Sequence, residues 1–359
     1  MALRPTIATH PRRVVADTMI ALVNHGPEPG SVELRRIPRP TLAPHSVMLR
    51  VDAVGVCGSD VHQWHGSHSW SVNYPCVLGH EFTGTVVEAG AGVLGFEPGA
   101  RVVSETAAVI DPSSPLSRRG LYQLDPTRLG FGYGVDGAMA PYVVTPARTL
   151  HHIPDSLEPI VAAVTEPCCV AYGAVCETQS VKPGDHVLVL GPGPIGILCA
   201  LLARLAGAAQ VVMVGTPADA ARLTLAADLG LATSLTGDAD DVVGGLGDGL
   251  GVDVTIDAAG VSAALETALR LTRPAGTIVK VGWGRDPVGF SLDPLVQKAL
   301  TLKGSFSHNW PIWERVIRML ADGHLDPRPL ISHVAPLEDW RGAFEGMRSG
   351  AYVKAVLLP

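Results

Sequence analysis

The chain contains 359 residues, 47% of them hydrophobic and 17% charged, with a formal net charge of −7. At roughly 100 to 200 residues per domain, this length predicts two domains. The negative charge argues against nucleic acid or an anionic membrane surface as the main partner, and no apolar run reaches the roughly 18 to 20 residues of a membrane span. We therefore expect a globular protein that acts on a small molecule.

Residues 1–18 precede the first strand-like run, MIALV, which begins at Met19. They lack the apolar core of a signal peptide, so we interpret them as an N-terminal extension and expect a cytoplasmic protein. The six cysteines show no paired disulfide spacing, which predicts reduced thiols.

Two patterns of secondary structure follow one another along the chain. Residues 19–142 contain short β-type runs separated by Gly, Pro and Asn, which is typical of an antiparallel or barrel-like β domain. From about residue 181, apolar strands alternate with helical segments, which predicts a parallel sheet covered on both faces. Residues 311–323 and 337–350 have helical spacing, and residues 352–359 read as a strand that could return to the first domain.

The stretch VLVLGPGPIGILCALL contains the spacing G-x-G-x-x-G directly after an apolar strand and at the start of a helix. Such glycines permit a tight turn, a close approach of the backbone to a pyrophosphate and close packing of helix on strand. The sequence therefore predicts a dinucleotide site at Gly191, Gly193, Pro194, Ile195 and Gly196.

The next strand of this region ends at Gly215 and Thr216, where an acidic residue commonly accepts hydrogen bonds from the adenosine ribose. Asp219 follows three residues later, and Arg222 is either a charge on the helix face or a contact for the cofactor. The choice between NAD and NADP therefore stays open, with a slight preference for NAD.

Zinc-ligand residue types gather in three separate stretches, GVCGSDVHQWHG, YPCVLGHEFTG and VTEPCCVAYG. They supply Cys57, His80, Glu81 and Glu166. A catalytic zinc uses three protein ligands of the thiolate, imidazole and carboxylate types and keeps a fourth position exchangeable. Taken singly, each residue is more typical of a packed or hydrogen-bonded side chain.

The joint pattern resembles the zinc-dependent medium-chain dehydrogenases, and the resemblance runs from Met19 to Pro359. It rests on CGSDVH, GHEFTGTVVEAG, DGAMAPYVV, EPCCVAYGAV and GPGPIG. The polyol and threonine dehydrogenase branch is most similar, because the chain carries EP where liver-type alcohol dehydrogenases carry a cysteine ligand. The resemblance implies a GroES-like catalytic domain at residues 19–178 and 312–359 and a Rossmann domain at 179–311.

The same resemblance implies roles for individual residues. Cys57 and His80 would be zinc ligands, and Glu81 or Glu166 would complete the catalytic shell directly or through water. Zinc would lower the pKa of a bound alcohol, whose hydride then passes to the nicotinamide. The alkoxide proton would leave through Ser59, the cofactor ribose and His62.

By the same resemblance, Gly282 and Trp283 fall at the nicotinamide end of the cofactor. Two further tryptophans, Trp64 and Trp70, could form an apolar wall for the substrate or cover loop surface, and neither role can be assigned.

Many family members bind a second, structural zinc through four cysteines in a lobe that corresponds to residues 110–126. Here those positions hold Asp111, Ser114, Ser117 and Asp125, whose hard oxygens suit a closed zinc site poorly. We therefore predict one zinc per chain and no structural zinc. Turns, prolines and inward packing of four side chains should hold the lobe instead, namely Leu116, Leu121, Tyr122 and Leu124.

The expected activity is the interconversion of a secondary alcohol and a ketone on a small polyol, sugar, cyclitol or related metabolite. One alternative is a zinc-free reductase in which Cys57 and His80 only pack. Another is a non-catalytic, dinucleotide-binding redox sensor. Family habit suggests a homodimer or homotetramer, with residues 300–308 as a candidate for strand pairing.

Overall fold

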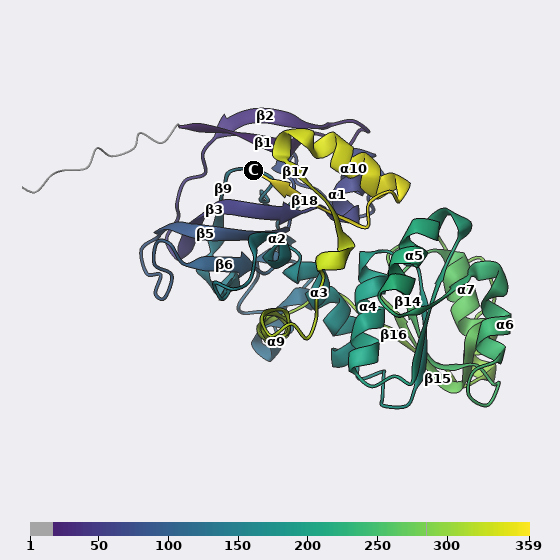
Figure 1. Ribbon diagram of the computed structural model, residues 1–359. Helices are drawn as coiled ribbons and strands as arrows, with labels where there is room; N and C mark the ends of the chain where they lie inside the picture. The colour runs from purple at the N-terminus through teal and green to yellow at the C-terminus, as the bar shows by residue number, and fades with distance from the viewer. Residues whose placement is uncertain (1–16, 285) are drawn as a thin grey trace, which may run out of the picture.

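The computed structural model describes residues 17–284 and 286–359, which form a β-rich part and an α/β part side by side (Figure 1). Most of the expected extension at residues 1–18 lies outside the described residues, and Thr18 is already the first residue of β1. Within the described ranges, no helix is long and apolar enough to cross a membrane.

The β-rich part contains a three-stranded sheet, a seven-stranded sheet and a two-stranded sheet. Their orders are β2-β1-β4, β10-β6-β5-β3-β18-β17 with β9 also paired to β3, and β7-β8. The strands are β1 (Thr18–Asn24), β2 (Val32–Pro38), β3 (Ser46–Gly55), β4 (Cys76–Val77), β5 (Glu81–Ala89), β6 (Arg101–Ser104), β7 (Ala107–Val109), β8 (Leu129–Gly130), β9 (Tyr142–Pro146), β10 (Leu150–His152), β17 (Ile331–Pro336) and β18 (Lys354–Leu358).

The centre of the large sheet brings distant parts of the chain together. β3 pairs antiparallel with β5 so that Gly55 lies opposite Glu81, and β18 pairs antiparallel with β3 so that Val356 also lies opposite Gly55. Five helices accompany these sheets: α1 (Gly58–Trp64), α2 (Pro159–Ala162), α3 (Thr165–Tyr172), α9 (Trp310–Ala321) and α10 (Trp340–Ser349).

The α/β part is one parallel sheet in the order β13-β12-β11-β14-β15-β16. Its elements are β11 (His186–Leu190), α4 (Pro194–Leu205), β12 (Gln210–Gly215), α5 (Ala220–Asp228), β13 (Ala232–Leu235), α6 (Ala239–Gly244), β14 (Val252–Asp257), α7 (Ser262–Leu271), β15 (Thr272–Lys280), α8 (Asp293–Gln297) and β16 (Thr301–Gly304).

The apolar run of β11 is explained by helices on both faces of this sheet. Successive strand residues point to opposite faces. Val187 and Val189 belong to the apolar cluster that includes α4 and α5, whereas Leu188 and Leu190 belong to the cluster that includes α6 and α7. The predicted fold class, a GroES-like β-rich domain plus a Rossmann domain, is therefore confirmed.

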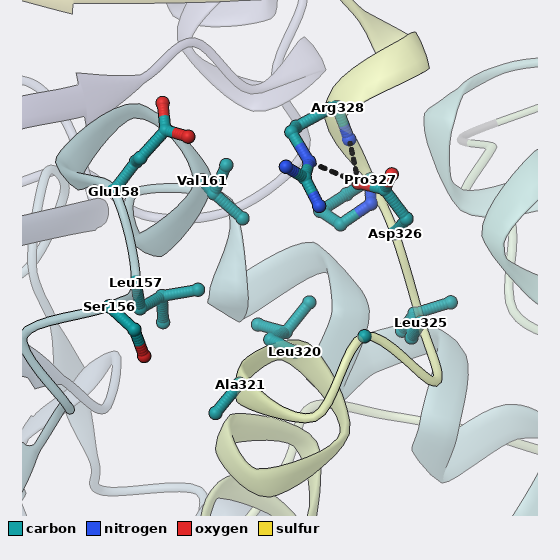
Figure 2. Close-up of a pocket in the computed structure, with 11 residues that line it drawn as sticks. Ser156, Leu157, Glu158, Val161, Leu320, Ala321, Leu325, Asp326, Pro327 and Arg328 are labelled. Atoms are coloured by element: carbon teal, nitrogen blue, oxygen red, sulfur yellow. Dashed lines mark hydrogen bonds and ion pairs between the residues drawn. The ribbon is translucent and has the colours of Figure 1, made fainter.

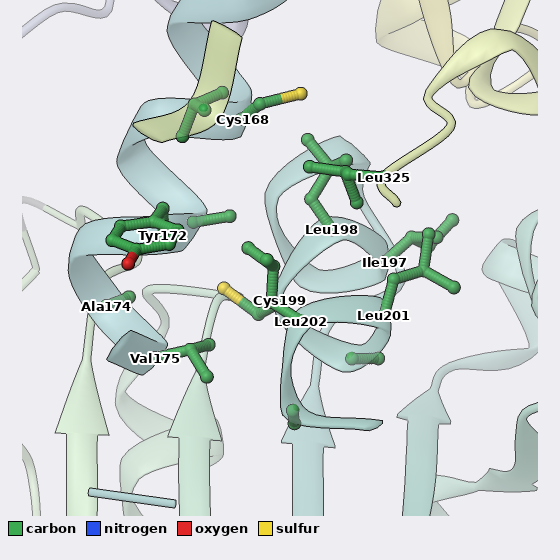
Figure 3. Close-up of a cluster of buried hydrophobic side chains, with 14 of the residues drawn as sticks. Cys168, Tyr172, Ala174, Val175, Ile197, Leu198, Cys199, Leu201, Leu202 and Leu325 are labelled. Carbon is green, nitrogen blue, oxygen red and sulfur yellow. The ribbon is translucent and has the colours of Figure 1, made fainter. Parts of the chain in front are cut away.

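One apolar cluster is continuous from α3 to α4 and α9, so the two parts share buried surface. Cys168 and Tyr172 of α3 lie opposite Leu198 and Cys199 of α4 (Figure 3). All six cysteines of the chain are free thiols. The helix α3 thus carries Glu166 in its first turn while its remaining turns are fixed against the α/β part.

Candidate metal and cofactor site

Three predicted zinc ligands meet where β3 ends and β5 begins. The Cys57 thiol, the His80 ring and the Glu81 carboxylate each offer one ligand atom, and these atoms lie within 4.8 Å of one another. Cys57 precedes α1, and His80 and Glu81 are buried. Strand pairing between β3 and β5 explains this convergence, because it sets Gly55 opposite Glu81.

Asp60, which the sequence analysis did not single out, holds the ligand loops in place. Its buried carboxylate accepts hydrogen bonds from the backbone N–H groups of Cys57, at 2.9 Å, and Gly79, at 3.4 Å. The same carboxylate lies 3.9 Å from Nδ1 of His80. Its position three residues after Cys57 is that of an acidic residue in a helical capping box, a signal that could have identified it.

Lys354 is a second residue that sequence reasoning missed. This buried side chain comes from β18, forms an ion pair with Glu81 and donates a hydrogen bond to the carbonyl of Val56 at 2.8 Å. A Cβ on Gly55 would overlap the Glu81 carboxylate, so any larger residue there would have to displace this carboxylate. The only signal in the sequence is a lysine inside an otherwise apolar terminal strand.

Glu166 faces this cluster from the first turn of α3, although it is not one of the three mutually close ligands. Its Oε1 accepts hydrogen bonds from His308 Nε2 at 2.9 Å and from the Thr106 hydroxyl at 3.4 Å. Burial opposes ionisation, but the contacts with His308 and the charges of His80 and Lys354 more than offset it, so the pKa of Glu166 lies below its ordinary value.

The electrostatics of the site favour a bound cation. Burial opposes the charged form of His80, yet Cys57, Asp60 and Glu166 together hold the pKa of His80 well above its ordinary value. A metal ion can take the place of that proton, and thiolate, imidazole and carboxylate are all zinc-ligand types. The residues present therefore fit a zinc ion.

The two residues predicted to move the substrate proton lie on α1, three positions apart and hence on one helix face. The Ser59 Oγ is buried without a hydrogen-bond partner among the described residues, which marks it as available to a ligand. His62 is exposed, and its Nδ1 is 2.9 Å from the Ser67 hydroxyl. The sequence predicts only short β-type runs in this region, so the helix α1 is a difference from expectation.

Of the two unassigned tryptophans, Trp64 packs in the core against Trp340 and Phe344. Trp70 instead makes an edge-to-face contact with Trp283, at 6.1 Å between ring centroids, and Trp283 stacks with Phe306. Trp283 is 60% exposed. The aromatic contact thus joins the loop after α1 to the segment after β15.

The geometry explains separately why glycine occupies each of the three glycine positions in the predicted cofactor loop. Gly191 has a φ of +96°, which favours glycine. A Cβ on Gly196 would overlap the carbonyl oxygen of Gly191. Apart from the adjacent residues, no atom of residues 17–284 or 286–359 would lie within 4 Å of a Cβ on Gly193, so this backbone borders open space at the N-terminus of α4, where Pro194 and Ile195 follow.

The end of β12 is shaped by Asp219. Its carboxylate accepts hydrogen bonds from the Thr216 backbone, at 3.0 Å, and hydroxyl, at 2.8 Å. Arg222 lies 3.3 Å from Asp219 and donates to the Met347 carbonyl of α10 at 3.2 Å. A Cβ on Gly215 would come within 3.2 Å of the Asp219 Cβ, so this side chain reaches back to the strand end.

At the other side of the sheet, Gly282 follows β15 and packs against the loop that follows β14. A Cβ on Gly282 would lie 2.5 Å from the Gly260 nitrogen and 2.8 Å from the Ala258 carbonyl carbon. The adjacent Trp283 is therefore held at the carboxyl edge of the sheet, where this class of fold binds its ligands.

The lobe at residues 110–126 is closed by its own hydrogen bonds. Asp111 accepts from the Ser113 backbone and hydroxyl, at 2.8 and 2.7 Å, and Asp125 accepts from the Thr127 backbone and hydroxyl at the same distances. The Tyr122 hydroxyl anchors the lobe elsewhere, because it donates to Glu105 and accepts from the first backbone N–H of α9, each at 2.6 Å.

One packing prediction for the lobe is wrong. Leu124 is 44% exposed, whereas its neighbours Gln123 and Asp125 are buried. The segment Tyr122–Leu124 forms a 3-10 turn, in which only one residue in three faces inward. Leu116, Leu121 and Tyr122 are half-buried.

A separate hollow of about 100 Å³ lies between α2 and the segment after α9 (Figure 2). Leu157, Val161 and Leu320 form its apolar lining, and Glu158 and Arg328 border it. None of the residues discussed above lines it, so this hollow is not the candidate active site.

Comparison with known proteins agrees with this geometry. Residues 43–155 match the family described as alcohol dehydrogenase GroES-like domain, and residues 194–322 match the zinc-binding dehydrogenase family. A sorbitol dehydrogenase from Halalkalibacterium halodurans is 34% identical over 345 residues, which cover 95% of this chain and 99% of the relative. A D-arabitol-phosphate dehydrogenase from Enterococcus avium is 34% identical over 322 residues, covering 89% and 91%.

Among solved structures, an alcohol dehydrogenase from Thermus sp. ATN1 superposes with a TM-score of 0.85. It is 30% identical, and the match covers 95% of this chain and 99% of that one. The chain therefore belongs to the zinc-type medium-chain dehydrogenase family, in its polyol dehydrogenase branch, and is an NAD(P)-dependent oxidoreductase.

Proposed function

We propose that this chain is a zinc-dependent dehydrogenase that interconverts a secondary alcohol and a ketone on a small polyol, sugar or related hydroxylated metabolite. The observation that carries the proposal is the meeting of Cys57, His80 and Glu81 within 4.8 Å. The buried, unpartnered hydroxyl of Ser59 lies two residues from the first of these ligands. The names of the relatives, which include sorbitol and arabitol-phosphate dehydrogenases, support the polyol class.

Cys57 and His80 would hold the zinc, with Glu81 as the third ligand in reach and Glu166 as a second carboxylate that faces the same group. When bound, zinc supplies a Lewis acid that lowers the pKa of an alcohol. Ser59 would take the hydroxyl proton of the substrate, and the exposed His62 would pass it on to solvent after relay through the cofactor ribose; the buried Ser59 hydroxyl and the exposure of His62 support these roles. Asp60 holds the ligand loops during this transfer.

We further propose one zinc per chain, because the positions of the lobe that would bind a structural zinc are held by Asp111 and Asp125 turns. The lobe carboxylates already accept hydrogen bonds from neighbouring residues. Metal analysis of protein purified in the presence of zinc should therefore find about one zinc per chain. Two tightly bound zincs would overturn this part of the proposal.

NAD is proposed as the preferred cofactor. Asp219 brings a carboxylate back to Thr216 at the end of β12, where the adenosine ribose lies in this fold. A carboxylate accepts from ribose hydroxyls and repels a 2′-phosphate. Titration with NADH and NADPH should show tighter binding of NADH. In Asp219→Ala, the ratio of the dissociation constants for NADPH and NADH should be smaller than in the wild type.

A homodimer or homotetramer is proposed from the exposed edge of the α/β sheet. Among the residues that the structure describes, β16 has a strand neighbour on one side only, and Leu302 on it is exposed. Unpaired strand edges of this kind are templates for pairing with a second chain. Light scattering of the purified protein should give the mass of a dimer or tetramer, and a monomer would contradict the proposal.

The central experiment is a panel of polyols, sugars and simple secondary alcohols, monitored at the nicotinamide absorbance band. We expect zinc-dependent turnover that is lost in His80→Ala. Ser59→Ala should lower kcat by about 10² to 10⁴, the usual contribution of a positioned proton acceptor. Full activity of zinc-free protein would support a metal-independent reductase instead, and absence of any turnover would support a binding protein.

A further inference from the structure

His308 lies between the candidate metal site and the core, and both of its ring nitrogens are engaged. The side chain is 1% exposed. The Trp313 Nε1–H donates to its Nδ1 at 2.7 Å, and its Nε2 lies 2.9 Å from Oε1 of Glu166. His308 thus connects α9 to the carboxylate that faces Cys57 and His80.

The chemistry of these partners fixes the position of the proton on His308. An indole N–H is a donor only, so Nδ1 of His308 must present its lone pair to Trp313. A neutral imidazole carries its proton on the other nitrogen, so Nε2–H of His308 donates to the Glu166 carboxylate. Trp313 therefore selects the one neutral tautomer that can hydrogen-bond to Glu166.

Thr106 completes the arrangement on the same carboxylate oxygen. Its hydroxyl oxygen lies 3.3 Å from Nε2 of His308 and 3.4 Å from Oε1 of Glu166. Because Nε2 carries a proton and cannot accept, the Thr106 hydroxyl directs its own hydrogen to Glu166. Oε1 then has two donors, which leaves Oε2 as the oxygen available to a metal ion or to a metal-bound water.

Trp313 is well fixed for this task. Its side chain is 1% exposed, and its ring stacks on His151 at 5.5 Å between centroids, with 10° between the planes. It is part of the apolar cluster shared by α3, α4 and α9. Movement of the indole is therefore opposed by packing on several sides.

We propose that Trp313 is a positioning residue for the metal site: it holds His308 in its Nε2–H form, and His308 in turn holds Glu166 with one oxygen free. The inference rests on the proposed function, because it assigns Glu166 to the metal centre. It adds a residue of α9, Trp313, to those that determine zinc affinity. Trp313 acts only through His308 and is not proposed as a ligand.

The tautomer is tested first, on the wild-type zinc-bound protein. Histidine labelled with ¹⁵N gives ring shifts that distinguish Nε2–H from Nδ1–H, and the signals of His308 are those lost in His308→Gln. We expect Nε2–H for His308 in the wild type. An Nδ1–H tautomer, or a doubly protonated ring at neutral pH, would overturn the proposal without any variant having to fold.

The second test measures zinc affinity by competition with a chelator. Trp313→Phe keeps an aromatic ring but removes the donor N–H, and we expect it to weaken zinc binding about 10-fold, since outer hydrogen bonds of metal ligands are commonly worth about 10- to 100-fold. Trp310→Phe makes the same change on the exposed part of α9 and should leave zinc affinity unchanged. Equal zinc affinity of wild type and Trp313→Phe would overturn the proposal.

A conservative variant separates positioning from packing. His308→Gln keeps a donor near the position of Nε2 and should retain most of the zinc affinity, whereas His308→Phe keeps the ring volume without a donor and should lose it. Equal losses in both variants would contradict the proposal. If Cys57→Ser and His80→Ala also bind zinc like the wild type, the proposed metal site itself is wrong. If only these two variants lose zinc and the Trp313 and His308 variants do not, the metal site stands and the positioning role of Trp313 is wrong.

Discussion

Single methyl groups on two glycines of the cofactor loop should separate cofactor binding from folding. The φ of Gly193 is −72°, which alanine adopts freely, and a Cβ there would meet nothing within 4 Å. A Cβ on Gly196 would instead overlap the carbonyl oxygen of Gly191 and lie 3.1 Å from the carbonyl carbon. The first change intrudes on open space beside the N-terminus of α4, and the second collides with backbone.

The magnitudes follow from these contacts. Gly193→Ala should cost less than about 1 kcal/mol of stability, because glycine is only a modest N-cap. Loss of one charge-assisted hydrogen bond to the pyrophosphate is worth about 1.5 to 3 kcal/mol, so NADH binding should weaken about 10- to 150-fold. Gly196→Ala should cost about 1 to 3 kcal/mol through overpacking, and Tm should fall by several degrees.

NADH binding is measured by fluorescence titration and stability by thermal unfolding of the same preparations. Gly342→Ala is a suitable control, because a Cβ on Gly342 also has no neighbour within 4 Å among the described residues and the residue belongs to α10, not to the loop. It should leave NADH affinity unchanged and raise stability by up to about 1 kcal/mol, because alanine is the better helix former. Wild-type affinity for NADH in Gly193→Ala would refute the placement of the pyrophosphate at the start of α4.

Three further outcomes are expected. In zinc-free protein, Lys354→Met leaves the buried Glu81 carboxylate unpaired and should destabilise the fold by about 3 to 5 kcal/mol, with Lys354→Arg less affected, as measured by chemical unfolding. Gly55→Ala should displace that carboxylate from its position beside Lys354 and lower zinc affinity in chelator competition. Hydrogen bonds from Ser114 and Thr127 lower the pKa of Asp125 below its ordinary value of 3.8. The ionised Asp125 therefore stabilises the fold, and the Tm difference between wild type and Asp125→Ala should be fully present above pH 3.8 and shrink as the pH falls further. A Tm difference that grows on acidification would contradict this reasoning.

Local patterns in the sequence were sufficient to predict a β-rich part, a parallel α/β sheet, and the strand, turn and helix around the three glycines. The three glycines lie within six residues, so their spacing alone expresses the geometry of one turn and one helix. The alternation of apolar strands and helices after residue 181 likewise reflects neighbouring elements of one sheet. The meeting of Cys57, His80 and Glu81 depends on the pairing of β3 with β5, which no local pattern reports. Their roles as ligands were predicted only from the family resemblance.

Contacts between distant residues were beyond the reach of the sequence. Lys354 meets Glu81, and Trp313 meets His308, only because of the way the sheet and α9 pack. The burial of these groups depends on tertiary packing, and no local periodicity reports it. The prediction that Leu124 packs inward was wrong because it inferred burial from hydrophobic character alone. In the structure the 3-10 turn points this side chain to solvent.

The position of β18 has a consequence for the order in which the molecule is completed. Lys354 donates to the carbonyl of Val56, 298 residues earlier in the chain. Its strand, β18, pairs with β3 on one side and with β17 on the other, so β17 joins the sheet through β18. During synthesis the α/β part, continuous from β11 to β16, has left the ribosome before this strand exists. We expect the α/β part to fold first and the buried carboxylate of Glu81 to acquire its counter-charge only after residue 354 has been synthesised and has left the ribosome. Limited proteolysis of chains stalled before and after residue 354 would test this order. The α/β part should resist the protease in both chains, and the β-rich part only in the longer one.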